Sequence, residues 1–213
     1  TLNHGLGEIP DFVICKNLGT NYNWFIWHNA FGNGADAAIY FTDAAKFTGY
    51  VTQPFGTFTT SSLTFNYNDG VNGAYDYICY AWKNVPGLQK FGKYAANNST
   101  NGPYVELGFK PALVCIKSMT TGGTARNWAV VDSTRSYANV ANHTLAWNLA
   151  DAESSFGSGV NVFGTANKID LLSNGFKIRD TGNWCNESGA TYIYMAWAES
   201  PFHNLYGGQA NAR

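Results

Sequence analysis

The side chains that most often bind metals are sparse in this sequence and are not spaced for that purpose. No two of the four histidines are separated by three residues, and none stands beside a cluster of cysteines or carboxylates, so no zinc site is expected. Three of the four cysteines lie in apolar, strand-like runs and the fourth lies in a polar loop. We expect buried free thiols that pack as small apolar side chains, while a disulfide between strands stays open. The histidines are His4, His28, His143 and His203, and the cysteines are Cys15, Cys79, Cys115 and Cys185.

Acid–base catalysis would have to come from the 14 Asp and Glu residues. A glycosidase needs two carboxyl groups about 5–10 Å apart, and no pair here stands in a setting that singles it out. Most lie at turns, where Asp accepts hydrogen bonds from backbone N–H groups. No nucleophile elbow, phosphate-binding loop or dinucleotide fingerprint is present, and segment 66–73 lacks the spacing of a calcium loop. We predict no catalytic residues, no metal and no cofactor; a carbohydrate-active hydrolase is the less favoured alternative.

The composition argues against several classes of partner. Charged residues make up 13% of the chain and the net charge is −1, so the basic surface of a nucleic-acid binder is not expected. No apolar run approaches the roughly 18 residues that a membrane span needs. The chain instead has 24 Asn, 23 Gly and 16% aromatic residues. These residues disfavour helix, and their abundance is typical of extracellular β-proteins and adhesins.

An internal repeat in the sequence indicates which elements would position any site. LGEIPDFVICK at 6–16 aligns with LGFKPALVCIK at 107–117, an offset of 101 residues. The dipeptide Asn-Trp at 23–24 recurs at 127–128, and YDYICYAWKNVP at 75–86 recurs as ATYIYMAWAESP at 190–201. The offset only grows along the chain, so the copies keep their order. The extra length of the second copy lies mainly between Trp128 and Tyr192.

The matched segments have the pattern of β-strands, because they are rich in β-branched and aromatic residues and are separated by Gly- and Asn-rich turns. In 192–197, Tyr192, Tyr194 and Ala196 are expected on one face of a strand, and the residues between them on the other. Evidence for helix is thin. We therefore predict an all-β fold: a tandem-duplicated antiparallel β-sandwich, jelly-roll-like, with little helix.

The repeat also suggests domain boundaries. Residues 1–86 would form the first β-sandwich repeat and 87–213 the second. The strand-like KFGKY at 90–94 is expected to open the second repeat, and the opening strand of the first is expected to be missing because the chain is cut before Thr1. Whether the copies are two domains or two halves of one sandwich stays open.

Within each copy, several residues have an expected local role. Gly7 and Gly108 suit tight turns, and the Pro three residues later marks the start of a strand. Lys16 and Lys117 are expected to lay their stems on apolar surface and keep their ammonium groups in water. Trp82 and Trp197 are expected to fill the core, with a sugar-stacking platform as the alternative. Val13, Tyr77, Ile78, Val114 and Ile193 are expected to be mostly buried.

The insertion that distinguishes the second copy is the predicted place for function. An insertion that the first copy lacks is not needed for the shared fold, and loops are where binding residues gather. The stretch STRSYANVANHTLAW at 133–147 supplies an aromatic and polar mixture suited to surface recognition or to subunit contact. A loop that merely covers an edge strand is the alternative. The candidate residues are Arg135, Tyr137, Asn142 and His143.

The repeated strings carry a family resemblance. GFKPALVCIK, Asn-Trp, LLSNGFKIRD, SGATYIYMAWAESPF and the closing ANAR resemble a domain of unknown function found, often in tandem, in tail fibre and other virion structural proteins of marine bacteriophages. The resemblance spans almost the whole chain. The first copy departs from the pattern, because LTFNYND replaces the NGFK string and AWKNVPG replaces AWAESPF.

The resemblance implies a virion component and no catalytic residues. We therefore expect a non-enzymatic phage protein in an external, extracellular appendage such as a tail fibre, which acts in attachment to a host-surface glycan. The expected partners are other copies of the chain, other virion proteins and a host glycan, with no nucleic acid and no membrane insertion. The alternative is a purely structural fibre or capsid-decoration domain without a ligand of its own.

Overall fold

The computed structural model describes residues 1–42, 44–48, 53–66, 68–122, 126–136, 138–150, 153–155 and 169–201. Within these residues the regular elements are antiparallel β-strands and one 3-10 turn, η1 (Asn29–Phe31). The predicted all-β class is confirmed. The candidate Tyr137 lies outside the described residues. No helix in the described ranges is long and apolar enough to cross a membrane.

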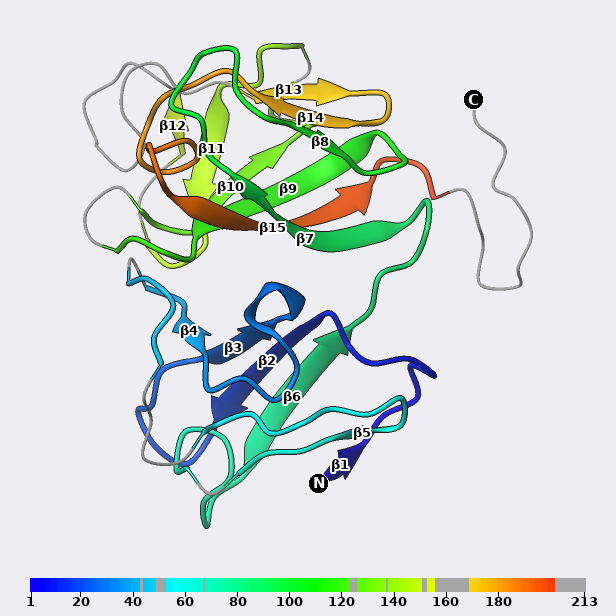
Figure 1. The fold of residues 1–213 in the computed structure, drawn as a ribbon, viewed down its shortest axis with the longest axis vertical. Helices are drawn as coiled ribbons and strands as arrows, with labels where there is room; N and C mark the ends of the chain where they lie inside the picture. The colour runs from blue at the N-terminus through cyan, green and yellow to red at the C-terminus, as the bar shows by residue number, and fades with distance from the viewer. Residues whose placement is uncertain are drawn as a thin grey trace.

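The first part of the chain forms a four-stranded sheet in the order β4-β3-β2-β6 and a small two-stranded sheet, β1-β5. Figure 1 shows them together in the lower half of the molecule. The strands are β1 (Leu2–Asn3), β2 (Phe12–Asn17), β3 (Phe25–His28), β4 (Ile39–Tyr40), β5 (Ser62–Leu63) and β6 (Tyr77–Trp82).

The rest of the chain forms a six-stranded sheet in the order β12-β11-β10-β9-β15-β7 and a three-stranded sheet, β13-β14-β8, above it in Figure 1. The strands are β7 (Gln89–Ala95), β8 (Tyr104–Glu106), β9 (Pro111–Ser118), β10 (Ala129–Asp132), β11 (His143–Ala146), β12 (Ser154–Ser155), β13 (Ile169–Leu172), β14 (Gly175–Ile178) and β15 (Thr191–Ala198).

The segments that align in the sequence occupy equivalent places in two sheets. The order β4-β3-β2-β6 matches β11-β10-β9-β15. Phe12 pairs with Trp82 in the first sheet, and Leu113 pairs with Trp197 in the second. The turn before the first aligned strand is also shared, because Gly7 and Gly108 both have positive φ, 72° and 85°. A difference is that β15 has β7 on its second edge, whereas β6 has no second neighbour within the described residues.

The central strands of the six-stranded sheet, β9, β10 and β15, are buried on both faces, and β15 shows how. Ile193 and Met195 belong to the hydrophobic core shared with the four-stranded sheet. Tyr192, Tyr194 and Ala196 belong to a second core under the three-stranded sheet. The predicted alternation along this strand is confirmed. Burial on both faces explains why the strand reads as a nearly continuous apolar run instead of alternating with polar residues.

The core between the two sheets joins residues from both sides of the predicted boundary at 86 and 87. The rings of Phe12 and Phe91 stack at a centroid distance of 5.6 Å and an interplanar angle of 14°. The indole Nε1 of Trp128 donates a 2.8 Å hydrogen bond to the carbonyl oxygen of Tyr40. No strand of the described residues pairs across that boundary. Side-chain packing and hydrogen bonds outside the strands, such as that from the Lys46 N–H to the Met119 carbonyl oxygen at 3.1 Å, therefore hold the sheets together. The division into repeats at 86 and 87 stays a prediction.

Burial departs from expectation at Lys117 and at the repeated tryptophans. Lys117 is fully buried, and its ammonium donates to the Ser118 carbonyl oxygen at 3.1 Å. The expectation of a hydrated ammonium was wrong there, because Lys117 follows Leu113 and Cys115 on the covered face of β9. Trp82 and Trp197 pack against the core while staying partly exposed.

The other residues that were predicted to lie in the core also differ in burial. Val13, Val114 and Ile193 are fully buried, whereas Tyr77 and Ile78 are half-buried because they lie on the edge strand β6.

His28, on β3, links the four-stranded sheet to the six-stranded sheet. Its two contacts fit only one protonation state of the ring. Its Nε2 lies 3.3 Å from the carbonyl oxygen of Tyr194, and its Nδ1 accepts a 3.1 Å hydrogen bond from the Ala30 N–H. A neutral ring with the proton on Nε2 satisfies both contacts, whereas a proton on Nδ1 would break the second. Burial lowers the pKa of His28 to about 4, although the contact with Tyr194 opposes this shift.

Stability should therefore carry a pH dependence that His28→Gln removes. Between pH 6.5 and about 4 the unfolded chain binds a proton that folded His28 excludes, so the wild type loses about 3 kcal/mol relative to the variant as the pH falls through this range. Above pH 6.5 the imidazole is neutral in both states and the difference is constant. Denaturant unfolding of both proteins at several pH values measures this. If the free energies of unfolding of the two proteins changed equally with pH, the result would contradict a buried neutral histidine.

Candidate functional site

The predicted recognition residues lie on the connection between β10 and β11. The turn that leaves β10 is organised by Asp132, whose Oδ1 accepts from the N–H groups of Thr134 at 3.0 Å and Arg135 at 2.8 Å. Its other oxygen pairs with the Arg135 guanidinium. Burial acts to raise the pKa of Asp132, but the N–H groups and the guanidinium outweigh it and hold the pKa below its ordinary value. Asp132 is thus ionised and structural.

The return of the chain to β11 is fixed by Ser136. This side chain is buried, and its Oγ accepts hydrogen bonds from the N–H groups of Asn142 at 3.2 Å and His143 at 3.1 Å. The amide of Asn139 donates to and accepts from the backbone of Leu171 on β13, both at 2.9 Å. The loop is therefore held by side chains at both ends and in the middle, which preorganises the surface it carries.

Two adjoining pockets open on this loop. The larger, of about 370 Å³, is lined by Lys110, Ser133, Ser136, Ala138, Asn139, Leu171 and Glu199. The smaller, of about 290 Å³, is lined by Arg135, Ser136, Ala138, Asn139, Val140, Asn142 and His143. The structure thus brings three of the four predicted residues, Arg135, Asn142 and His143, to one pocket. Each pocket is near the lower end of the size range of small-ligand sites.

The ionisable groups around the pockets lie in pairs. Lys110 and Glu199 form an ion pair at 2.6 Å, and His143 Nδ1 lies 2.6 Å from Glu153 Oε1. Arg135 pairs with Asp132, but its Nη1 is buried and has no hydrogen-bond acceptor within the described part of the chain. The lining therefore presents hydroxyl, amide and guanidinium groups with little net charge, a chemistry suited to neutral, oxygen-rich ligands.

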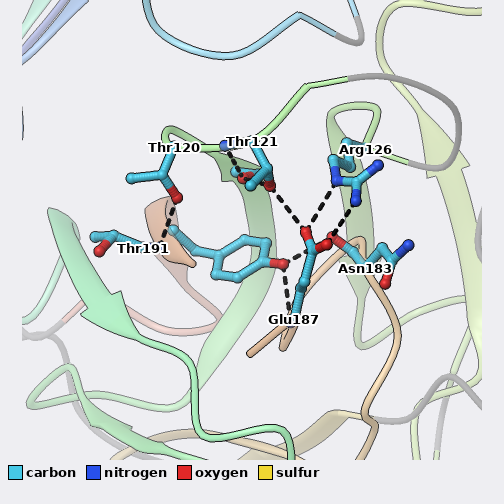
Figure 2. Close-up of polar contacts among 8 residues, drawn as sticks. Thr120, Thr121, Arg126, Asn183, Glu187 and Thr191 are labelled. Carbon is cyan, nitrogen blue, oxygen red and sulfur yellow. Dashed lines mark hydrogen bonds and ion pairs between the residues drawn. The ribbon is translucent and has the colours of Figure 1, made fainter. Parts of the chain in front are cut away.

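A second polar cluster, at the opposite end of β9, is structural. Glu187 accepts from Arg126 through both carboxylate oxygens, at 2.9 and 2.6 Å, and from the Thr121 hydroxyl at 2.9 Å (Figure 2). The hydrogen bond from Arg126 lowers the pKa of Glu187. Tyr192 donates its hydroxyl to the Asn183 carbonyl at 2.7 Å and accepts from the Glu187 N–H at 3.0 Å. These bonds tie two loops to the sheet and leave Glu187 unsuited to act as a base.

Sequence reasoning missed Lys110, Ser136, Asn139 and Glu199. A signal for two of them was present: Lys110 precedes the first repeated strand of its copy and Glu199 follows the last. Because β9 and β15 are antiparallel neighbours, these positions meet, and the Glu199 N–H donates to the Lys110 carbonyl oxygen at 2.9 Å. Ser136 and Asn139 carry no comparable signal, because their partners are set by the course of the loop.

No metal site emerges from the described ranges, where no three His, Cys, Asp or Glu side chains gather in one group. In comparisons with known proteins, the sequence model of one family, described as "Domain of unknown function (DUF7483)", matches residues 1–201. No curated protein and no solved structure matches the chain.

The loop architecture predicts unequal effects of two serine substitutions beside the same pocket. Ser136→Ala removes the acceptor of two N–H groups from a buried position and should cost roughly 1–3 kcal/mol. Ser133→Ala removes a hydroxyl from the pocket wall and should stay within about 0.5 kcal/mol. Urea unfolding of both variants measures the difference. Equal losses would mean that Ser136 does not pin the loop.

Proposed function

The chain belongs to the family of the domain of unknown function DUF7483, and from that premise we propose that it is a non-enzymatic virion protein of a bacteriophage. In this proposal it is a domain of a tail fibre or related external appendage, and it attaches to a glycan on the host surface. The motif resemblance to marine phage virion proteins supports the viral role. The pockets on the loop between β10 and β11 support the recognition role.

The observation that carries the glycan proposal is the chemistry of this pocket pair. Sugars are neutral and rich in hydroxyl groups, and each hydroxyl both donates and accepts hydrogen bonds. The pockets offer matching groups: the exposed Asn142, the ring of His143 and the Arg135 guanidinium. Amide, imidazole and guanidinium groups on a pocket wall can form hydrogen bonds with sugar hydroxyl groups.

The same surface gives little support to hydrolysis. Glycoside hydrolysis needs a carboxylate free to act as nucleophile or base and a carboxylic acid to protonate the leaving group. The carboxylates beside the pockets, Asp132, Glu153 and Glu199, each lie against a basic side chain. Paired carboxylates position a loop well and act poorly as bases, which supports a role in binding.

Repetition is part of the proposal. The shared strand order and register support a tandem duplication of one strand unit. Single glycan contacts are weak, and joining several copies multiplies their effect. We therefore propose that the chain acts as a homo-oligomer held by other virion proteins. The free edge of β6 in the described structure is a suitable surface for a second copy.

Binding is tested with the oligomeric chain on an array of bacterial surface glycans. Asn142→Ala removes an exposed amide from the pocket and should weaken binding about tenfold, which corresponds to about 1.4 kcal/mol. The matched control is Asn3→Ala, an exposed asparagine on β1, which should leave binding unchanged. Equal binding by both variants would place recognition elsewhere. No bound glycan at all would favour the purely structural role.

A further inference from the structure

Two cysteines that are distant in the sequence stand opposite each other on adjacent strands. Cys15 on β2 and Cys79 on β6 are register partners in the four-stranded sheet, and each is a free thiol. The equivalent pair in the six-stranded sheet is Ile116 and Tyr194, which carries no sulfur. Cys115 and Cys185 have no cysteine as a strand partner.

The hydrogen-bond pattern shows what kind of pair this is. The Leu18 N–H donates to the Asp76 carbonyl oxygen at 2.8 Å, which makes 18 and 76 a hydrogen-bonded pair. Such pairs alternate with non-hydrogen-bonded ones along an antiparallel ladder. Three residues further along, Cys15 and Cys79 form a non-hydrogen-bonded pair. In pairs of that kind the Cα atoms lie about 4.5 Å apart, inside the roughly 4.4–6.8 Å range of disulfides.

The two thiols differ in their exposure to solvent. Cys15 is 1% exposed and its Sγ lies 3.9 Å from the Val71 carbonyl oxygen, whereas Cys79 is only half-buried on the edge strand. A small oxidant can therefore reach Cys79 first. Burial raises the pKa of both thiols to about 12, and for Cys15 the neighbouring Cys79 adds to this rise. Few thiolates are present near neutral pH, so the exchange is slow.

We propose that Cys15 and Cys79 are an oxidisable pair that closes into a cross-strand disulfide by exchange with a low-molecular-weight disulfide. The Cys79 thiolate attacks one sulfur of the reagent, forms a mixed disulfide and releases one reagent thiolate. The Cys15 thiolate then attacks Cys79 Sγ and displaces the second reagent thiolate. Two protein thiols are oxidised, one reagent disulfide is reduced to two thiols, and the two protons pass to solvent or to the released thiolates.

The link has a structural consequence for the edge strand. β15 is held by neighbours on both sides, β9 and β7, whereas β6 has only β2 within the described residues. A bond from Cys79 to Cys15 fastens β6 to its one neighbour and closes a long chain loop, which restricts the unfolded chain. This inference rests on strand register alone and does not depend on the proposed attachment role.

The test uses the full chain incubated with oxidised glutathione, then alkylated in denaturant and mapped by peptide mass spectrometry. The expected product has two of its four thiols consumed and one cross-linked peptide pair containing Cys15 and Cys79, in more than tenfold excess over any other pair. Its thermal midpoint should rise and return to the starting value after reduction. Cys15→Ser should accumulate glutathione on Cys79, and Cys115→Ser should cross-link like the wild type.

The mapping of the wild-type protein decides the outcome even if a variant fails to fold. Four alkylated thiols after prolonged incubation would overturn the proposal. So would a cross-link to Cys115 or Cys185, or glutathione that stays on Cys79 in the wild type without closing the bond.

Discussion

Burial of both faces of the central strands of one six-stranded sheet, β9, β10 and β15, is the constraint on which the rest of this structure depends. An antiparallel sheet usually leaves one face to water, but here the four-stranded sheet covers one face and β13, β14 and β8 cover the other. Without the first part of the chain, Met195, Ile193 and Phe91 would lose their cover. Each large apolar side chain contributes roughly 1.5–3 kcal/mol when it is buried. The two parts of the chain therefore stabilise each other.

The candidate site follows from this scaffold. Because β9, β10 and β15 are fixed from both faces, the segments at their ends are fixed as well, and the pockets form where these segments meet. Lys110 precedes β9, Glu199 follows β15, and the loop after β10 supplies the remaining wall. Ser136 and Asn139 then fasten that loop to its own backbone and to β13. A rigid base and a pinned loop allow an exposed surface to hold one arrangement of polar groups.

The sequence predicts the strands well because their pattern is local. The repeat aligned β2 with β9 and β6 with β15, and in the structure these strands have equivalent neighbours and register. The alternation along 192–197 was sufficient to place each side chain on its face. The same pattern could not show that the four-stranded sheet covers the face of β9 that carries Cys115 and Lys117, so the full burial of Lys117 was missed.

The other contacts that the sequence did not predict join residues that are distant in the sequence. Arg126 and Glu187 are 61 residues apart, and Asn139 and Leu171 are 32 apart. Nothing local in either segment points to the other. Three of the four candidate residues could be picked out because an insertion is a simple signal, whereas the lining supplied by other segments depends on how the loop folds. The Cys15 and Cys79 pair needed the strand register, which sequence spacing alone does not give.

The central claim is that both parts of the chain share one core, and calorimetric unfolding tests it most directly. If the claim holds, the chain unfolds in a single transition whose calorimetric and van't Hoff enthalpies agree. Phe91→Ala, which removes the ring stacked on Phe12, then lowers the midpoint of that one transition without splitting it. Two resolved transitions, with only the second part of the chain responding to Phe91→Ala, would contradict the claim and show that the sheets fold independently.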